Sequence, residues 1–382
     1  MKKKLAWLML AAMVVTVLLS GCGTKNSNTF KIGMTGPLTG GAAQYGIAAQ
    51  RGAQIAVEEI NAKGGIQFEL KVEDDTHDAE KAANAYNALI DWGMQISLGS
   101  VTSTPCEATA RIAAAEKIFA LTPSASSTSV TKAGGGYQFQ ICFSDPNQGS
   151  ASAVYIKNKG LATKVAIIYK NDDVYSTGIY ESFKTKAAEL GLSVVSETSF
   201  NDDTDTDFSV QVAAARTAGA DLIFLPMYYE PASLIFAECS KIGYTPKFFG
   251  VDGMDGILTM KGFDTKLAEG VILLTPFAAD ASDAKTKSFV QKYQEKYGEI
   301  PIQFAADGYD CIYAIYEALQ KCDAKASMTA AEIGALLKDT FTSSSFSFSG
   351  LTGSGMTWNA AGEVTKDPKG MEIKNGAYVG LD

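Results

Sequence analysis

The stretch LGSVTSTPCEA, Leu98–Ala108, joins a short apolar segment, MQIS, to a helical pattern, EATARIAAAE. Four hydroxyl side chains stand at this turn: Ser100, Thr102, Ser103 and Thr104. A second hydroxyl-rich turn, LTPSASSTS, follows the next apolar segment. Such turns either cap the helices that begin there or form one side of a site for a small ligand. The strand-turn-helix order of this stretch, repeated along the chain, decides the fold class.

Apolar segments alternate with helical patterns on both sides of this turn. FKIGMTGP, FELKVEDD, MQISLGS and KIFALTPS predict strands, and a helix is predicted from Gln44 to Asn61. The series restarts with KVAIIYK, LSVVSETSF, DLIFLPM, KFFGVDG and VILLTPF. Two longer helices follow, around Asp283 to Tyr297 and Phe304 to Lys321, before a Ser/Gly-rich stretch and hairpin-like strands. This alternation predicts an α/β protein with two similar lobes, each a parallel sheet flanked by helices.

Composition excludes several classes of function. The net charge is −9, with no basic block beyond the first residues, so nucleic acid is excluded as a partner. His77 is the only histidine and no cysteine pair has metal-ligand spacing, which argues against a zinc site or a histidine-based triad. There is no G-x-S-x-G motif for a secreted hydrolase. We expect no catalytic residues, no metal and no cofactor.

The chain begins with features of a lipoprotein signal. Lys2–Lys4 precede the apolar run Leu5–Leu19, which is short for a spanning helix. LSGC, Leu19–Cys22, resembles a bacterial lipobox, in which cleavage precedes the cysteine and a lipid is attached to it. We predict a signal peptide over residues 1–21, lipidation of Cys22 and a flexible tether over residues 22–29. The protein would then sit on the extracytoplasmic face of the cell membrane; a plain signal peptide with an incidental cysteine is the alternative.

Polar residues at the expected strand ends suit a zwitterionic ligand. A carboxylate favours the N–H groups of a helix N-terminus, and Ser103 stands at such a position. Thr104 is predicted as the helix cap, with Glu107 completing a capping box. Asp252 lies in the glycine-flanked turn FFGVDGMDG and is the candidate partner of an ammonium group, ahead of Asp255. An Asx-turn acid and ordinary helix caps are the purely structural alternatives.

An ordered set of motifs carries a family resemblance. KIGMTGPLTGGAAQYG, RGAQIAVEEINAKGGI, LGSVTSTP, LTPSASST, AIIYKNDDVYSTG, FLPMYYEPA, FFGVDG and AADGYDCIYAIYEAL together resemble the leucine/isoleucine/valine-binding proteins, the type I periplasmic solute-binding proteins of ATP-driven importers. The resemblance implies two Rossmann-like lobes joined by three hinge crossings that close on the ligand. The N-terminal lobe would comprise residues 30–144 and 275–350, and the C-terminal lobe residues 145–274 and 351–382. The crossings would lie near Cys142–Pro146, Thr275–Phe277 and Gly350.

The resemblance also implies roles for eight residues. Ser103 would hold the ligand carboxylate, the Ser124 carbonyl would accept from the ammonium, and the Ser126 hydroxyl would contact the head group. Asp252 stands where the family has an acid, often glutamate, that pairs with the ammonium; aspartate is one methylene shorter. The pocket wall would be formed by Tyr45, Tyr175, Tyr228 and Phe304.

The implied function is capture of a small amino acid by a monomer and its delivery to an ABC permease. Leucine, isoleucine and valine are the default ligands, with other amino acids, amides, urea or aromatic acids as alternatives. An anchored sensor of the same fold would use the same cleft, so sequence does not separate sensing from transport.

Overall fold

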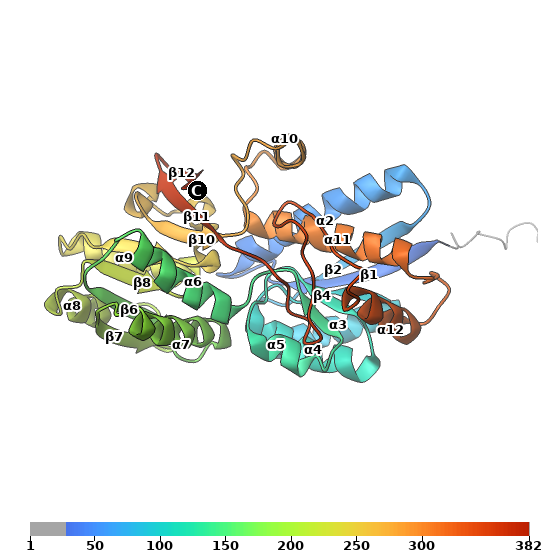
Figure 1. The fold of residues 1–382 in the computed structure, drawn as a ribbon, viewed down its shortest axis with the longest axis horizontal. Coiled ribbons are helices and arrows are strands. Elements are labelled where there is room, and N and C mark those ends of the chain that lie inside the picture. The colour runs from blue at the N-terminus through green and yellow to red at the C-terminus, as the bar shows by residue number, and fades with distance from the viewer. Residues whose placement is uncertain (1–27, 382) are drawn as a thin grey trace, which may run out of the picture.

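Two lobes of sheet and helix lie side by side in the computed structural model, which describes residues 28–381 (Figure 1). The predicted signal peptide, Cys22 and most of the tether fall outside these residues. The predicted α/β class, the parallel sheets and the two lobes are confirmed.

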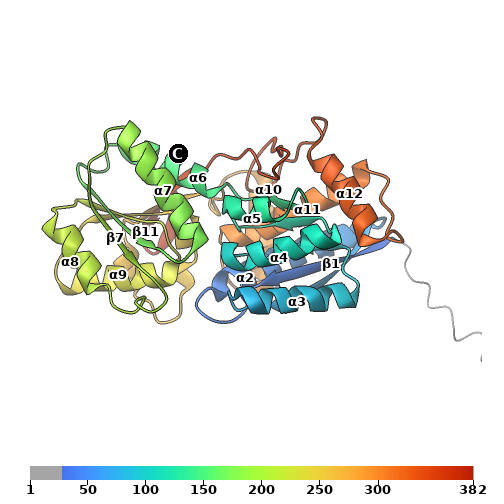
Figure 2. The ribbon, with the colours of Figure 1, turned by 90° about the horizontal axis from the view of Figure 1, so that it is seen from below.

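The N-terminal lobe is built on a five-stranded parallel sheet of order β2-β1-β3-β4-β5. Its strands are β1 Thr29–Gly36, β2 Gln67–Asp74, β3 Ile96–Leu98, β4 Ala120–Thr122 and β5 Gln138–Gln140. Its helices are α2 Ala43–Lys63, α3 Ala79–Trp92, α4 Ser103–Glu116, α5 Thr128–Ala133, α10 Ala284–Tyr297, α11 Gln303–Lys321 and α12 Ala330–Phe341. Helices α2 and α11 pack together on one face, with α3 and α4 on the other (Figures 1 and 2).

The C-terminal lobe has a seven-stranded sheet of order β12-β11-β10-β9-β8-β6-β7. Its parallel strands are β6 Val165–Lys170, β7 Val194–Phe200, β8 Leu222–Leu225, β9 Lys247–Gly250 and β10 Ile272–Thr275. The antiparallel hairpin at the edge consists of β11 Lys369–Lys374 and β12 Ala377–Gly380. The helices are α6 Asp145–Asn158, α7 Val174–Glu189, α8 Ser209–Thr217 and α9 Tyr229–Lys241, with 3-10 turns at Asp252–Met254 (η1), Ile257–Thr259 (η2) and Thr265–Ala268 (η3).

Strand β6 shows why the apolar runs predicted this lobe. Its side chains alternate between the two faces of the sheet, because successive residues of a strand point in opposite directions. Val165 and Ile167 enter the core beneath α6 and α7, whereas Ala166 and Ile168 enter the core shared with α8 and α9. A strand covered on both faces therefore reads as an unbroken apolar run.

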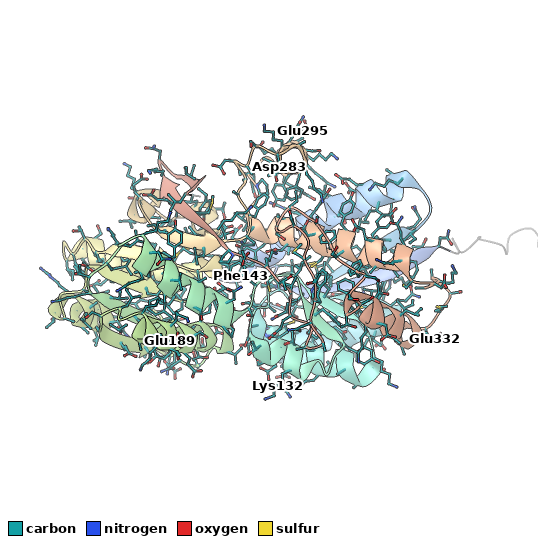
Figure 3. The ribbon with its side chains drawn as sticks, in the orientation of Figure 1. Lys132, Phe143, Glu189, Asp283, Glu295 and Glu332 are labelled. Carbon is teal, nitrogen blue, oxygen red and sulfur yellow. The ribbon has the colours of Figure 1, made fainter. Side chains whose placement is uncertain are left out.

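The chain crosses between the lobes three times, and the third crossing is later than predicted. Residues 141–144 join β5 to α6, residues 276–283 join β10 to α10, and residues 367–368 precede β11. Figure 3 places Phe143, which is 1% exposed, between the two lobes at the first crossing.

The assignment of residues 351–366 to the C-terminal lobe is wrong. The Trp358 indole N–H donates to the Gln140 carbonyl at 2.7 Å, and the Gln140 N–H donates to the Gly362 carbonyl at 2.9 Å. The Leu351 N–H donates to the Asp310 carboxylate at 2.8 Å. These bonds attach the Ser/Gly-rich stretch to the N-terminal lobe, so the crossing near Gly350 moves to residues 367–368.

None of the five cysteines in the described part of the chain is paired. No helix among residues 28–381 is both long and apolar enough to cross a membrane.

A buried ion pair holds the crossings together. The Lys366 ammonium, in a side chain only 1% exposed, donates to the Ile141 carbonyl at 2.7 Å, to Thr352 Oγ1 at 2.6 Å and to the Asp307 carboxylate at 3.2 Å. Burial raises the pKa of Asp307 to about 7, and the Lys366 charge opposes that rise. The pair thus links the first crossing, α11 and the segment leading to the third.

Replacing Lys366 tests the strength of this link. Lys366→Met should lower the free energy of unfolding by about 3 kcal/mol, because it leaves Asp307 and a buried carbonyl without their donor. Urea unfolding at pH 8 measures the change. The matched control is Lys374→Met, which breaks the exposed pair with Glu372 and should leave the free energy of unfolding nearly unchanged. Equal losses in the two variants would contradict a structural role for Lys366.

Candidate functional site

Seven of the eight predicted site residues follow the carboxyl ends of parallel strands, where open α/β sheets bind ligands, and Phe304 at the start of α11 lies against Tyr45. The N-terminal lobe supplies Ser103 at the start of α4, Ser124 and Ser126 between β4 and α5, Tyr45 in α2 and Phe304 in α11. The C-terminal lobe supplies Tyr175 in α7, Tyr228 before α9 and Asp252 in η1. Seven of the eight are buried and Tyr228 is half-buried. The structure therefore gathers the whole set at the junction of the lobes.

Aromatic rings form a continuous cluster across this junction. The Tyr45 ring lies 4.6 Å from that of Phe304 and 5.4 Å from that of Tyr228, measured between centroids. Tyr228 stacks on Tyr175 with centroids 4.7 Å apart and an interplanar angle of 9°. Burial raises the pKa of Tyr228 well above its ordinary value, and a hydrogen bond from the Ser103 backbone opposes the rise. The cluster thus reaches the N-terminus of α4.

Hydrogen bonds join the two hydroxyl-rich turns. The Ser124 hydroxyl donates to the Val101 carbonyl at 2.6 Å, and Ser103 Oγ accepts from the Ser127 N–H at 3.3 Å. Ser126 Oγ is buried without a protein partner. The hydroxyl of Ser124 is therefore used within the fold, whereas that of Ser126 has no hydrogen bond of normal length and acts on the Asp145 carboxyl, whose rise in pKa it opposes.

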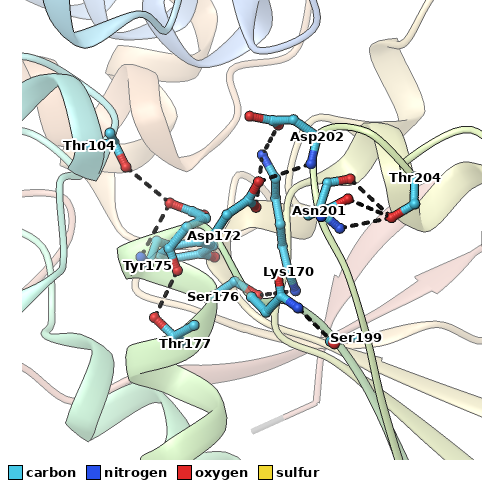
Figure 4. Close-up of polar contacts among 12 residues, drawn as sticks. Thr104, Lys170, Asp172, Tyr175, Ser176, Thr177, Ser199, Asn201, Asp202 and Thr204 are labelled. Carbon is cyan, nitrogen blue, oxygen red and sulfur yellow. Dashed lines mark hydrogen bonds and ion pairs between the residues drawn. The ribbon is translucent and has the colours of Figure 1, made fainter.

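The predicted helix cap is wrong in detail. Thr102, not Thr104, is the N-cap residue of α4, and Glu107 accepts from the Ser129 hydroxyl at 2.9 Å instead of closing a capping box. Thr104 is the second residue of the helix, and its hydroxyl donates to the Asp173 carboxylate of the other lobe at 3.3 Å. Figure 4 shows Thr104 facing the first turn of α7, beside Tyr175.

Further bonds across the junction show that the lobes are closed on each other. The Tyr45 hydroxyl donates to the Gly253 carbonyl at 2.5 Å and accepts from the Tyr229 N–H at 3.1 Å. In return, the Tyr229 hydroxyl donates to the Gly41 carbonyl at 2.6 Å. Each of these bonds requires both lobes.

One carboxylate oxygen of Asp252 accepts a hydrogen bond within the protein, and the other does not. Oδ1 accepts from the Tyr175 hydroxyl at 2.6 Å, and the Asp252 N–H donates to Gln148 Oε1 at 3.2 Å. Oδ2 is buried and has no protein partner. Burial raises the pKa of Asp252 to about 6, and the bond from Tyr175 opposes that rise. Asp255, the weaker candidate, instead accepts from the Gln303 N–H at 2.7 Å.

Three titratable groups at the junction were not predicted from the sequence. Asp145 opens α6, and both of its carboxylate oxygens are buried without a partner; burial raises its pKa well above the ordinary range. Asp173 caps α7, and burial raises its pKa while His77 opposes the rise. His77 Nδ1 lies 2.8 Å from Thr102 Oγ1, and its ring lies 5.4 Å from that of Tyr228. The only available signal was the position of Asp173 two residues before Tyr175.

The site has the chemistry of a binding pocket. It combines a helix N-terminus, buried hydroxyl and carboxylate groups without partners, and aromatic walls. Within residues 28–381, no group of histidine, cysteine and acidic side chains is arranged to hold a metal ion.

Comparison with known proteins identifies the class. Residues 29–377 match the periplasmic binding protein family. The chain belongs to that family. Its relatives and its fold are those of solute-binding proteins, and it is not an enzyme.

Several relatives resemble it over most of their length. A leucine-, isoleucine-, valine-, threonine- and alanine-binding protein of Pseudomonas aeruginosa is 26% identical over 298 residues, which cover 77% of this chain and 79% of that protein. The crystal structure of the leucine-binding protein LivK of Thermotoga maritima is 29% identical, with a TM-score of 0.81 over 92% of this chain and 98% of that one. LivJ of Streptococcus pneumoniae in complex with isoleucine is also 29% identical, with a TM-score of 0.81 over 92% and 97%.

Proposed function

We propose that this protein captures a branched-chain amino acid between its lobes and delivers it to an ABC permease. The observation that carries the proposal is the interlobe cluster itself, where buried Asp252 Oδ2 and Ser126 Oγ lack protein partners. Relatives that bind leucine and isoleucine share the fold over nearly the whole chain, which supports the choice of ligand.

The α4 N-terminus is the proposed carboxylate site. Unpaired backbone N–H groups at a helix start, together with the helix dipole, favour a negative group. The Ser103 hydroxyl stands at the first position of this helix and adds one donor. The ligand carboxylate would thus be held by the N-terminal lobe.

The ammonium group is proposed to face Asp252. Its free Oδ2 supplies both an acceptor and a charge, while the Tyr175 hydroxyl fixes the other oxygen. The Ser124 carbonyl and the Ser126 hydroxyl are the proposed further acceptors. Aspartate is shorter than glutamate by one methylene. The hydrogen bond from the Tyr175 hydroxyl orients the Asp252 carboxylate, and this orientation is proposed to let the shorter side chain reach the ligand.

The aliphatic side chain is proposed to lie against Tyr45, Tyr175, Tyr228 and Phe304. These rings present apolar faces, and the hydroxyls of Tyr45 and Tyr175 are already bound to protein groups. A wall whose polar atoms are satisfied favours an apolar side chain over a polar one.

Attachment to the membrane through a lipid on Cys22 completes the proposal. The LSGC motif and the polar tether support it, because an anchored binding protein stays near its permease. Globomycin-sensitive processing and a mass shift on a peptide that begins at Cys22 would be its direct readouts.

Asp252 is expected to control both affinity and its pH dependence. Replacing it by asparagine should weaken leucine binding by about 30- to 1000-fold at pH 8, since the ammonium loses its charged partner. In the wild type, protonation below pH 6 removes the same charge, so the dissociation constant should rise about 10-fold between pH 8 and pH 5. Calorimetry with leucine, isoleucine and valine measures both effects.

The control for this prediction is Asp255→Asn. Asp255 lies in the same turn region and burial also raises its pKa to about 6, but it binds Gln303. This variant should keep the wild-type pH profile, whereas Asp252→Asn should flatten it. An unchanged dissociation constant in Asp252→Asn would remove this residue from the proposed site.

Ser103→Ala is expected to weaken binding by about 1–3 kcal/mol, because the backbone N–H groups of α4 remain. Wild type should prefer leucine to its methyl ester, and the variant should show a smaller preference. The matched control is Ser129→Ala, which removes a hydroxyl bound to Glu107 and should leave both affinities unchanged. Equal affinity of the wild type for leucine and for its methyl ester would contradict the carboxylate site.

Ligand binding should also change the shape of the molecule. Both lobes contribute groups to the proposed site, so the open form should predominate without ligand and the closed form with it. Small-angle scattering should give a smaller radius of gyration at saturating leucine. An identical profile with and without bound leucine would argue against hinge closure.

A further inference from the structure

A second cavity lies beside the hinge, away from the eight residues of the proposed amino-acid site. Its volume is about 560 Å³, within the range of small-molecule pockets. The second crossing and α10 bound it on one side, and η2 and the β11–β12 hairpin bound it on the other. Figure 1 shows α10 and this hairpin along the same edge of the molecule. A molecule in this cavity would therefore contact both lobes.

The walls of the cavity are mainly apolar and its charges are all negative. The apolar lining includes Leu258, Phe277, Val290, Ile300, Ile302 and Met371. Ile300 is 60% exposed and lies at the edge of the cavity lining. Asp255, Asp280 and Glu299 line the cavity, and no lysine or arginine of the described residues does so.

Asp255 is the polar group that makes this cavity a site. The residue is 5% exposed, and its Oδ2 accepts from the Gln303 N–H at 2.7 Å. Its Oδ1 is buried with no hydrogen bond of normal length, and the nearby Tyr378 hydroxyl, which accepts from the Gly256 N–H at 3.0 Å, opposes the rise in the pKa of Asp255 that burial causes. Glu299 is less available, because it pairs with Arg51 at 2.7 Å. A buried carboxylate oxygen without a donor is costly, and a cationic donor would satisfy both its charge and its hydrogen bond.

We propose that this hinge cavity is a second binding site, for a small organic ammonium ion whose apolar body packs against Leu258, Val290 and Ile300 while its ammonium group donates to Asp255. An anion is disfavoured by the three lining carboxyl groups. A neutral apolar molecule would fill the volume but leave Asp255 Oδ1 unpaired. The site shares no residue with the proposed amino-acid site and does not depend on it.

Calorimetry with phenethylammonium chloride as the probe tests the proposal. The probe should bind wild type, whereas 2-phenylethanol, its neutral counterpart, should bind at least about 10-fold more weakly because it lacks the charge. Asp255→Asn should weaken phenethylammonium binding by a similar factor. Failure of the probe to bind wild type, or equal affinities for the two probes, would overturn the proposal.

Two further variants locate the bound probe. Asp252→Asn removes the neighbouring buried carboxylate, whose charge acts on Asp255, and should weaken phenethylammonium binding less than Asp255→Asn does; a larger loss than in Asp255→Asn would place the probe between the lobes and refute the hinge site. Val290→Trp fills the cavity from α10 without touching Asp255, so it should abolish binding even if Asp255→Asn fails to fold. Retained binding in Val290→Trp would also overturn the assignment.

Discussion

The buried Lys366–Asp307 pair is the constraint on which the two-lobed arrangement depends. An ammonium in a protein interior is tolerated only when its hydrogens are all used. Lys366 meets this condition with three acceptors, from the first crossing, from α11 and from the Thr352 hydroxyl. Because these acceptors come from distant parts of the chain, the lysine fixes where the crossings leave the N-terminal lobe.

A second carboxylate extends this fixed region. Asp310, three residues after Asp307 and thus on the same side of α11, accepts from the Leu351 and Thr352 N–H groups at 2.8 Å and from the Thr352 hydroxyl at 2.7 Å. The long polar segment before the third crossing is therefore tied down at both ends. Only the short stretches after these anchors remain to bend, which confines relative motion of the lobes to a hinge.

The sequence predicted the fold well where buried strands appear as unbroken runs of apolar residues. Buried parallel strands such as LIFL at Leu222–Leu225 read as continuous apolar runs, so they were predicted directly. Strand β5, Gln138–Gln140, was missed because two of its three buried residues are polar. The placement of the stretch after Phe341 was missed as well, because its few apolar residues are separated by serine, glycine and threonine. Its attachment depends on packing of Trp358 against Phe341, with ring centroids 4.7 Å apart, and no local pattern reveals such a contact.

The site residues also divide into those that the sequence predicted and those that it did not. Residues at strand ends, such as Ser103 and Asp252, could be predicted because parallel sheets place strand ends along one edge and because the motifs resemble a known family. Asp145, Asp173 and His77 could not. An acid at a helix start has the same local sequence whether it caps the helix in water or faces the opposite lobe, and only the closure of the lobes distinguishes the two cases.

Three buried acids at one junction raise the question of which one carries the charge that a zwitterionic ligand needs. Carboxyl groups in a shared low-dielectric region do not all ionise together, so protons stay where desolvation is least offset. Burial raises the pKa of Asp145 well above the ordinary range, and the Ser126 and Ser127 side chains only partly oppose that rise. Asp252 is held by the Tyr175 hydroxyl and its pKa rises only to about 6. Burial thus raises the pKa of Asp145 well above the ordinary range and that of Asp252 only to about 6, so Asp252 is the more readily ionised of these two partners for an ammonium group.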